Sequence, residues 1–293
     1  MLNPTTQRPD PLTTLKNYLE LVKFAHTVFA LPFALAAMLV AAKGFPEWRI
    51  FGWILLAMVG ARTAAMGFNR IVDREIDARN PRTKNRELPS GKVSLRGAWM
   101  LVAFSSLAFC FAAWKINLLA LALSPLTLGV LFFYSFCKRF TSLSHFVLGL
   151  CLGIAPVGAW VAVTGAIGIP SGALCAAVLF WVAGFDIIYA TMDADFDSQN
   201  GLNSMVRKLG IARALGFAKV LHAAFVANLV LFGVLAHLDA IYFGAVALIG
   251  AFLVYEHALV KPNDLRRVNA AFFTVNGAIA VFFLAAVALS VFV

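Results

Sequence analysis

Two clusters of acidic residues contain the side chains of this chain that are best suited to chemistry. They hold eight of its fourteen Asp and Glu residues and lie roughly 120 positions apart. In a chain that is 61% hydrophobic, a carboxylate at the end of an apolar helix is costly unless it binds something cationic. A divalent metal ion is the first candidate. The clusters are Asn69, Asp73 and Asp77 with Glu75 and Glu87 nearby, and Asp186, Asp193, Asp195 and Asp197.

Helical spacing predicts that each cluster forms a polar stripe. The first repeats every four positions from Asn69 to Asp77, and the second is spaced 3, 4 and 4 from Asp186 through Tyr189 to Asp197. Residues at these spacings share one face of a helix. The alternative is that the acids are merely solvated or paired with neighbouring Arg residues. Because the pattern recurs at equivalent helix ends, we expect the two stripes to face each other across a cavity.

Basic residues follow both stripes. Mg²⁺ prefers a few carboxylates together with water and substrate phosphates, and Arg and Lys side chains bind the remaining oxygens. The pattern therefore suits a diphosphate held through magnesium. Arg62 lies two helical turns before Asn69 in an apolar segment, where an unpaired cation is costly, so we expect it to line the cavity. The other basic candidates are Arg79, Arg82, Lys84, Arg86, Lys138, Arg139, Arg207 and Lys208.

The composition predicts an all-α polytopic membrane protein. Mean hydropathy is +0.85, only 13% of residues are charged, and long apolar stretches recur along the chain. An unbroken helix from Gly97 to Phe136 would be about 60 Å long, so we predict a break near Asn117. Residues 1–15 are interpreted as a flexible tail and 16–293 as a single transmembrane domain. The nine expected spans are 19–42, 48–71, 97–115, 118–136, 143–164, 172–191, 214–236, 240–260 and 269–292.

Basic residues are distributed unevenly between the two sides of the expected bundle. With the N-terminus inside, the inner segments hold twenty Lys and Arg residues and the outer loops three, which fits the positive-inside rule. Val293 is then outside and both stripes face the cytoplasm, in what we expect to be a bacterial inner membrane. The net charge of +10 is accounted for by the inner loops, so we expect no nucleic-acid partner.

The cysteines and histidines give no metal-binding pattern. The four cysteines lie singly in or beside spans, and the five histidines are scattered. We interpret the cysteines as small packing residues and each histidine as a hydrogen-bonded core or interface residue.

Three motifs in order resemble the 4-hydroxybenzoate polyprenyltransferase (UbiA) superfamily of intramembrane aromatic prenyltransferases, over residues 15–293. N-x-x-x-D-x-x-x-D runs from Asn69 to Asp77 and is followed by R-T-x-x-R-x-L-P-S-G. Y-x-x-x-K-R spans 134–139, and D-x-x-Y-x-x-x-D-x-x-x-D spans 186–197. The resemblance implies a nine-helix bundle in which both acidic motifs hold Mg²⁺ and the diphosphate of a polyprenyl donor. It also implies that the prenyl group is transferred to an aromatic hydroxy acid in respiratory quinone biosynthesis.

The resemblance assigns roles to particular residues. The expected magnesium ligands are Asp73, Asp77, Asp193 and Asp197. Asn69, Tyr134 and Asp186 are expected to support substrate binding. The diphosphate candidates are Arg82, Arg86, Lys138, Arg139 and Lys208. Arg62 and Tyr189 are the candidates for orienting the aromatic acid, and together with Asp73 and Asp193 they form the expected catalytic set.

Departures from the family pattern leave the acceptor open. Arg70 stands where Asp is often found, Glu87 replaces the usual Pro, and Asn203 replaces a common Lys. The sequence around Asp73 looks more like the menaquinone branch that works through futalosine and prenylates 1,4-dihydroxy-6-naphthoate. A rival class is the secondary transporter, but that predicts carboxylates near the bilayer midplane rather than at one face. The sequence does not specify prenyl chain length, oligomeric state or protein partners.

Overall fold

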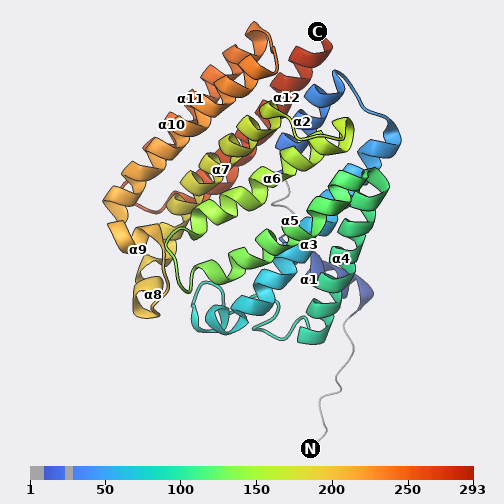
Figure 1. The fold of residues 1–293 in the computed structure, drawn as a ribbon. Coiled ribbons are helices and arrows are strands. Elements are labelled where there is room, and N and C mark those ends of the chain that lie inside the picture. The colour runs from blue at the N-terminus through green and yellow to red at the C-terminus, as the bar shows by residue number, and fades with distance from the viewer. Residues whose placement is uncertain (1–9, 24–28) are drawn as a thin grey trace, which may run out of the picture.

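Long helices run side by side through a computed structural model of the chain, which describes residues 10–23 and 29–293 (Figure 1). The basic loop 80–94 and the short helices after α7 lie at one end of the bundle, and the C-terminus lies at the other. The helices are α1 (Pro11–Leu21), α2 (Leu31–Ala42), α3 (Trp48–Arg79), α4 (Leu95–Ile116), α5 (Leu118–Cys137), α6 (Ser144–Thr164), α7 (Ile169–Ala190), the 3₁₀ turn η2 (Thr191–Asp193), α8 (Ala194–Gln199), α9 (Met205–Leu209), α10 (Ile211–Leu235), α11 (Ala240–Leu259), the π-helical turn η3 (Ala270–Val275) and α12 (Asn276–Phe292).

Eight of these helical stretches are long and apolar enough to cross a membrane: α3, α4, α5, α6, α7 with its continuation to Gln199, α10, α11, and η3 with α12. The predicted first span, 19–42, is wrong as a single helix. Within the described residues it divides into the end of α1 and the twelve-residue α2, which is about 18 Å long and too short to cross alone. The predicted tail lies mostly outside the described residues, but residues 11–15 belong to α1.

Polar side chains at the helix starts fix where several elements begin. The predicted break between α4 and α5 is confirmed: Asn117 is extended, and its side chain accepts a 2.8 Å hydrogen bond from the N–H of Ala120. Ser94 caps α4 in the same way, and Ser204 caps α9. Such caps satisfy backbone donors that have no partner within the helix.

The largest buried core lies among α2, α7, α10 and α12. Phe33 stacks on Phe283, and Trp181 stacks on Phe225, with ring centroids 4.6 and 5.8 Å apart. A buried polar chain crosses this core: Trp181 Nε1 donates to Asn276 Oδ1 at 2.6 Å, and Asn276 Nδ2 donates to Glu256 Oε1 at 2.7 Å. It ties α7 to α11 and α12.

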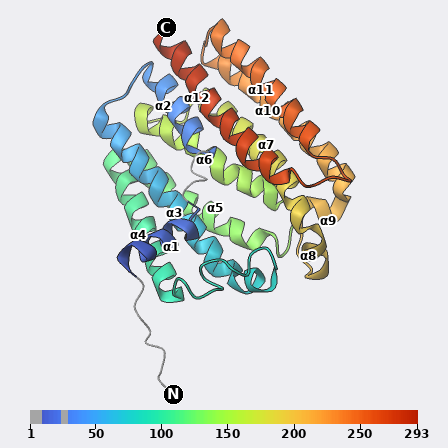
Figure 2. The same cartoon turned by 180° about the vertical axis from the view of Figure 1, so that it is seen from behind.

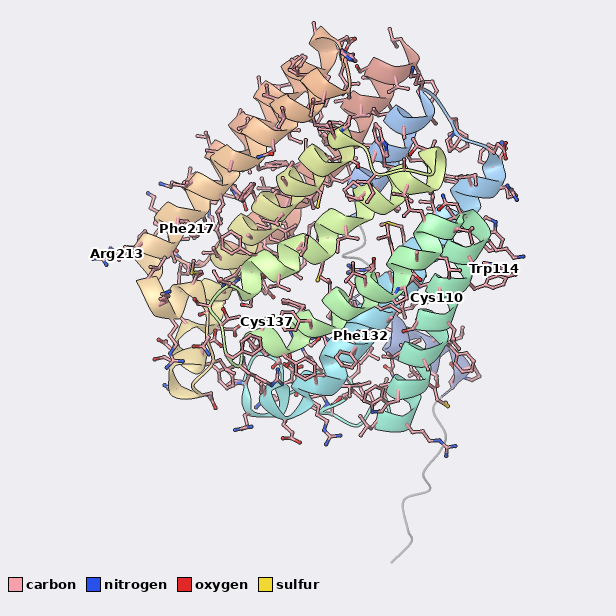
Figure 3. The ribbon with its side chains drawn as sticks, in the orientation of Figure 1. Cys110, Trp114, Phe132, Cys137, Arg213 and Phe217 are labelled. Carbon is pink, nitrogen blue, oxygen red and sulfur yellow. The ribbon has the colours of Figure 1, made fainter. Side chains whose placement is uncertain are left out.

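The outer surface is apolar, as lipid contact requires. Trp114 of α4 points away from the bundle, whereas Arg213 projects at the end where α9 meets α10 (Figure 3). Helix α1 crosses the outside of α3 and α4 (Figure 2). It exposes Leu12, Leu15 and Leu19 along one side, the pattern of a helix that lies in a membrane interface.

Glycine permits the close approach of α6 to α7. A Cβ at Gly149 would lie 2.3 Å from the carbonyl oxygen of Leu179, which is backbone and cannot move aside. We expect Gly149→Ala to cost about 1–3 kcal/mol of stability, because overpacking forces the helices apart. Thermal unfolding in detergent should show a clear fall in Tm. Gly158→Ala on the same helix is the matched control, since its Cβ would meet no atom within 4 Å. Equal Tm values for the two variants would contradict the prediction.

Candidate active site

A polar cavity of about 200 Å³ opens at the end of the bundle that carries the basic loop. Helices α3, α5, α6 and α7 contribute to its wall, together with the loop after α3 and the segment around α8. The acidic stripes meet here, as predicted. The acidic side chains that line it are Asp73, Asp77, Asp186, Asp193 and Asp197.

Asp73 is held by two cations from the end of α5. Lys138 Nζ lies 2.6 Å from its Oδ2, and Arg139 Nη2 lies 3.1 Å from its Oδ1. Asn69, one turn earlier on α3, donates to the same carboxylate at 3.2 Å. The Asp73 side chain is only 5% exposed, so these charge-assisted bonds replace the water that it gave up on burial.

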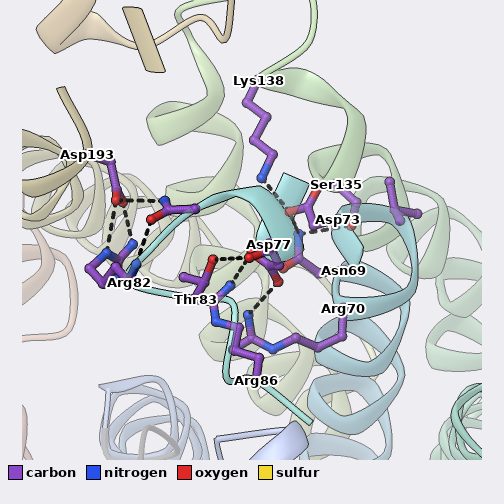
Figure 4. Close-up of polar contacts among 12 residues, drawn as sticks. Asn69, Arg70, Asp73, Asp77, Arg82, Thr83, Arg86, Ser135, Lys138 and Asp193 are labelled. Carbon is purple, nitrogen blue, oxygen red and sulfur yellow. Dashed lines mark hydrogen bonds and ion pairs between the residues drawn. The ribbon is translucent and has the colours of Figure 1, made fainter. Parts of the chain in front are cut away.

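Asp77 lies in the last turns of α3 and binds the loop that follows the helix. Arg86 Nη1 is 2.7 Å from Asp77 Oδ1, and the Thr83 hydroxyl donates to the Asp77 carbonyl at 3.0 Å (Figure 4). Asp77 Oδ2 is buried and accepts no hydrogen bond from the described residues, although Arg70 Nη1 lies 3.9 Å away. This oxygen therefore has capacity for a further cationic ligand.

Arg82 connects the two stripes. Its Nε donates to Asp193 Oδ1 at 2.9 Å, and its Nη2 pairs with Asp193 Oδ2 (Figure 4). Its Nη1 donates to the Tyr189 hydroxyl at 2.9 Å. Asn80 also donates to Asp193, at 3.1 Å. Burial alone would lower the pKa of Arg82, but the bonds to Asp193 outweigh it and the pKa is raised. The guanidinium therefore remains charged.

The second stripe does not lie on one continuous α-helix. Helix α7 ends at Ala190, and the chain passes through η2 before α8 begins. Asp186 and Tyr189 are thus on α7, Asp193 is in the 3₁₀ turn, and Asp197 is on α8; all four nevertheless line the cavity. Asp186 binds no Arg or Lys among the described residues, and its Oδ2 lies 2.6 Å from His145 Nδ1.

A second cavity, of about 220 Å³ and mostly apolar, adjoins the first. Asn69 and Tyr134 line both, so the two spaces share a wall. Arg62 was predicted to line the cavity between the acidic stripes; it lines the adjoining apolar cavity instead, where it is the one charged side chain among the described lining residues. Its Nη2 donates to the Lys23 carbonyl at 3.0 Å, while its buried Nε has no hydrogen-bond partner in the described structure. Among the described residues Arg62 forms no ion pair with Asp186 or another acidic side chain.

The basic candidates separate into two groups. Arg82 and Arg86 from the loop after α3 and Lys138, directly after α5, line the polar cavity, and Arg139 pairs with the lining residue Asp73. Lys208 is not among the residues that line the cavity, and its side chain is exposed on α9. The prediction that Lys208 contacts the diphosphate has no support in this geometry.

Sequence reasoning missed His145, Asn80, Thr83 and Ser204, which also line the cavity. His145 is the second residue of α6, which follows the turn after Lys138 and Arg139, and this position could have revealed it.

The carboxylates fit a magnesium ion only if the ion brings further ligands. Within residues 10–23 and 29–293, no group of three or more His, Cys, Asp or Glu side chains could hold a metal ion by itself. Mg²⁺ is typically bound through one or two carboxylates, with water and substrate phosphates completing its octahedron. The unbonded Asp77 Oδ2 and the cavity beside it match that requirement.

Comparison with known proteins decides the family. The sequence profile of the UbiA prenyltransferase family matches residues 30–290. The chain belongs to this family. Among its relatives is a 4-hydroxybenzoate octaprenyltransferase of Nitrosospira multiformis, which is 31% identical over 80% of each chain.

Solved structures of the family share the fold. An apo UbiA homologue from Aeropyrum pernix superposes with a TM-score of 0.82 at 37% identity, covering 90% of this chain and 98% of its own. A UbiA homologue from Archaeoglobus fulgidus, solved with GPP and Mg²⁺, gives a TM-score of 0.71 at 21% identity, covering 92% and 99%. The chain is therefore an integral membrane prenyltransferase of the UbiA fold.

Proposed function

We propose that this enzyme transfers a polyprenyl group from a polyprenyl diphosphate to an aromatic hydroxy acid of the 4-hydroxybenzoate type, with Mg²⁺ as cofactor. The single observation that carries the proposal is the pair of adjoining cavities, one lined by carboxylates and basic groups and the other by apolar side chains. A prenyl diphosphate has the same two parts. The curated relative from Nitrosospira multiformis and the magnesium-bound homologue from Archaeoglobus fulgidus support the same reaction.

The polar cavity supplies the groups that ionisation of an allylic diphosphate needs. Negative charge develops on the leaving diphosphate, and Arg82, Arg86, Lys138 and Arg139 are the side chains placed to stabilise it. Asp73, Asp77, Asp193 and Asp197 would hold Mg²⁺, which when bound neutralises diphosphate oxygens. In the present structure Asp73, Asp77 and Asp193 pair with these basic side chains. Substrate and metal would therefore exchange these partners.

The apolar cavity suits the prenyl chain and protects the reactive centre. An allylic cation is quenched by water, and this lining is almost entirely apolar. Arg62 and Tyr189 are our candidates for orienting the acceptor. The buried Nε of Arg62 has no hydrogen-bond partner among the described residues, and the Tyr189 hydroxyl binds Arg82 beside the polar cavity. A carboxylate bound to Arg62 would place the acceptor ring near the wall that both cavities share.

The acceptor is either 4-hydroxybenzoate or 1,4-dihydroxy-6-naphthoate. The named relatives favour the first and thus ubiquinone biosynthesis. The sequence around Asp73, which resembles the menaquinone branch, favours the second. Both reactions use the same carboxylates and the same donor.

A direct assay tests the function. Purified protein with Mg²⁺ and geranyl diphosphate should prenylate one of the two acceptors, and the faster acceptor identifies the pathway. Excess EDTA should abolish the activity. Asp73→Asn or Asp193→Asn should lower turnover by about 100-fold or more, because an amide keeps the shape but loses the charge that holds the metal. Full activity in excess EDTA, or full activity of both the Asp73→Asn and the Asp193→Asn variant, would contradict the proposal.

Arg62→Lys tests the acceptor-orienting role. We expect kcat/KM for the aromatic acid to fall by about 10- to 100-fold, because an ammonium cannot replace a planar guanidinium that donates in two directions. The Tm should change little for Arg62→Lys and Arg62→Gln. Steady-state kinetics and thermal unfolding of the wild type and both variants are measured in the same detergent. A large fall in Tm with near-normal kinetics would show that Arg62 is a structural residue.

We also propose that the active site faces the cytoplasm of a bacterial inner membrane, with the N-terminus inside and the C-terminus outside. The support is the distribution of basic residues, twenty on the proposed inner side against three on the outer. In a variant without the four native cysteines, a membrane-impermeant thiol reagent added outside intact cells should label Ile167→Cys and not Asn85→Cys. Both positions are exposed at opposite ends of the bundle. The reverse labelling pattern would overturn the orientation.

A further inference from the structure

Arg70 is a buried cation of the polar cavity to which the proposed reaction assigns no role. It lies on α3 about two helical turns before Asp77, on the same face of the helix. It lines the cavity although only 5% of its surface is exposed. A cation buried in an apolar helix is costly unless polar or anionic groups compensate for it. The partners of Arg70 therefore indicate what it can bind.

The guanidinium of Arg70 is held through its Nε atom. Nε donates to the backbone carbonyl of Leu21, the last residue of α1, at 3.3 Å. A carbonyl at the end of a helix has no partner within that helix, so this bond helps to fix the end of α1. It leaves Nη1 and Nη2 without a hydrogen bond to any residue of the described ranges.

Asp77 approaches Arg70 but does not bind it closely. Arg70 Nη1 lies 3.9 Å from Asp77 Oδ2, which is beyond hydrogen-bond distance (Figure 4). The other oxygen of Asp77 keeps its short ion pair with Arg86, at 2.7 Å. A ligand that binds Arg70 therefore leaves Asp77 neutralised.

The basic side chains already proposed for the diphosphate are engaged more tightly than Arg70. Each of them lies 3.1 Å or less from a carboxylate oxygen: Arg82, Arg86, Lys138 and Arg139. An anion must compete with a carboxylate for every one of these groups. Arg70 presents two terminal nitrogens in one plane, and an anion can reach them without breaking a short ion pair. Such a planar pair of donors matches two phosphate oxygens.

We propose that Arg70 binds the diphosphate of the prenyl donor, in addition to the basic side chains named above. The inference rests on the proposed function and adds a donor-binding residue to it. Arg70 then has two separate contacts, one with the substrate through its terminal nitrogens and one with α1 through Nε. The alternative is that Arg70 serves only to tie α1 to α3.

Two variants separate these two contacts. The Gln amide nitrogen lies as many bonds from Cα as Nε of Arg, so Arg70→Gln keeps a donor for Leu21 and loses the cation. Lys has a methylene at the position of Nε and its ammonium one bond further, so Arg70→Lys keeps the cation and loses the donor at that position. Binding of the diphosphate favours Lys, whereas a contact that serves only the fold favours Gln.

The experiment measures the Kd of geranyl diphosphate by isothermal titration calorimetry, with Mg²⁺ and without an aromatic acceptor, together with Tm in the same detergent. We expect Arg70→Gln to raise the Kd by about 10- to 100-fold at a nearly unchanged Tm, because charge-assisted hydrogen bonds are lost. Arg70→Lys should stay within about 5-fold of the wild-type Kd, because it keeps the charge.

Arg74→Gln is the matched control. Arg74 is exposed on the same helix, where it pairs with Glu75, so this variant removes the same charge outside the cavity. Its Kd for geranyl diphosphate should equal that of the wild type.

Three results would overturn the inference. They are a wild-type Kd in Arg70→Gln, a Kd in Arg70→Lys as weak as that in Arg70→Gln, and an Arg70→Gln protein that does not fold, which would show that the cation itself serves the fold. A wild type that binds no geranyl diphosphate, or that binds it and prenylates neither acceptor, is a different failure. That failure removes the proposed function, so the two are distinguishable.

Discussion

Neutralisation of buried carboxylates by cations from other parts of the chain is the interaction on which this architecture depends. Asp73 and Asp77 lie at the end of an apolar helix and are almost fully buried. Unpaired, each would cost several kcal/mol. Their partners come from the end of α5 and from the loop after α3, and Arg82 of that loop reaches across to Asp193. The ion pairs therefore also fix the positions of the loop and of the segment after α7.

The rest of the bundle is built to keep this charged end aligned with an apolar interior. Glycine lets α6 lie close to α7, and the bonds from Trp181 through Asn276 to Glu256 tie α7 to the last two helices. Helix α7 thus carries Asp186 and Tyr189 while it is held on several sides. Because α7 is held along its length, the positions of Asp186 and Tyr189 near its end are well defined.

The sequence predicted best those features of the fold and the site that follow from the period of the α-helix and from the placement of charged residues. The stripe from Asn69 to Asp77 and the place of Arg62 in a cavity wall follow from one helix, and the break at Asn117 follows from its length. Periodicity does not say which residue of another helix lies opposite, so the partnership of His145 with Asp186 was missed. Periodicity also does not say whether Lys208, on the short helix α9, lines the cavity, and it is not among the lining residues. The first span was misplaced because hydropathy does not register the turn after α1.

If the polar cavity binds Mg²⁺ and a diphosphate as proposed, its internal ion pairs imply that the two bind cooperatively. A diphosphate alone would draw Lys138 from Asp73 or Arg82 from Asp193 and leave that carboxylate less fully neutralised. A metal ion alone would leave the basic side chains without partners. Only both together satisfy every charge, so each raises the affinity of the site for the other by the same factor. Without ligands, the carboxylates and basic side chains of the cavity neutralise one another. An anion that binds without its cation must break these ion pairs, so it gains little binding free energy.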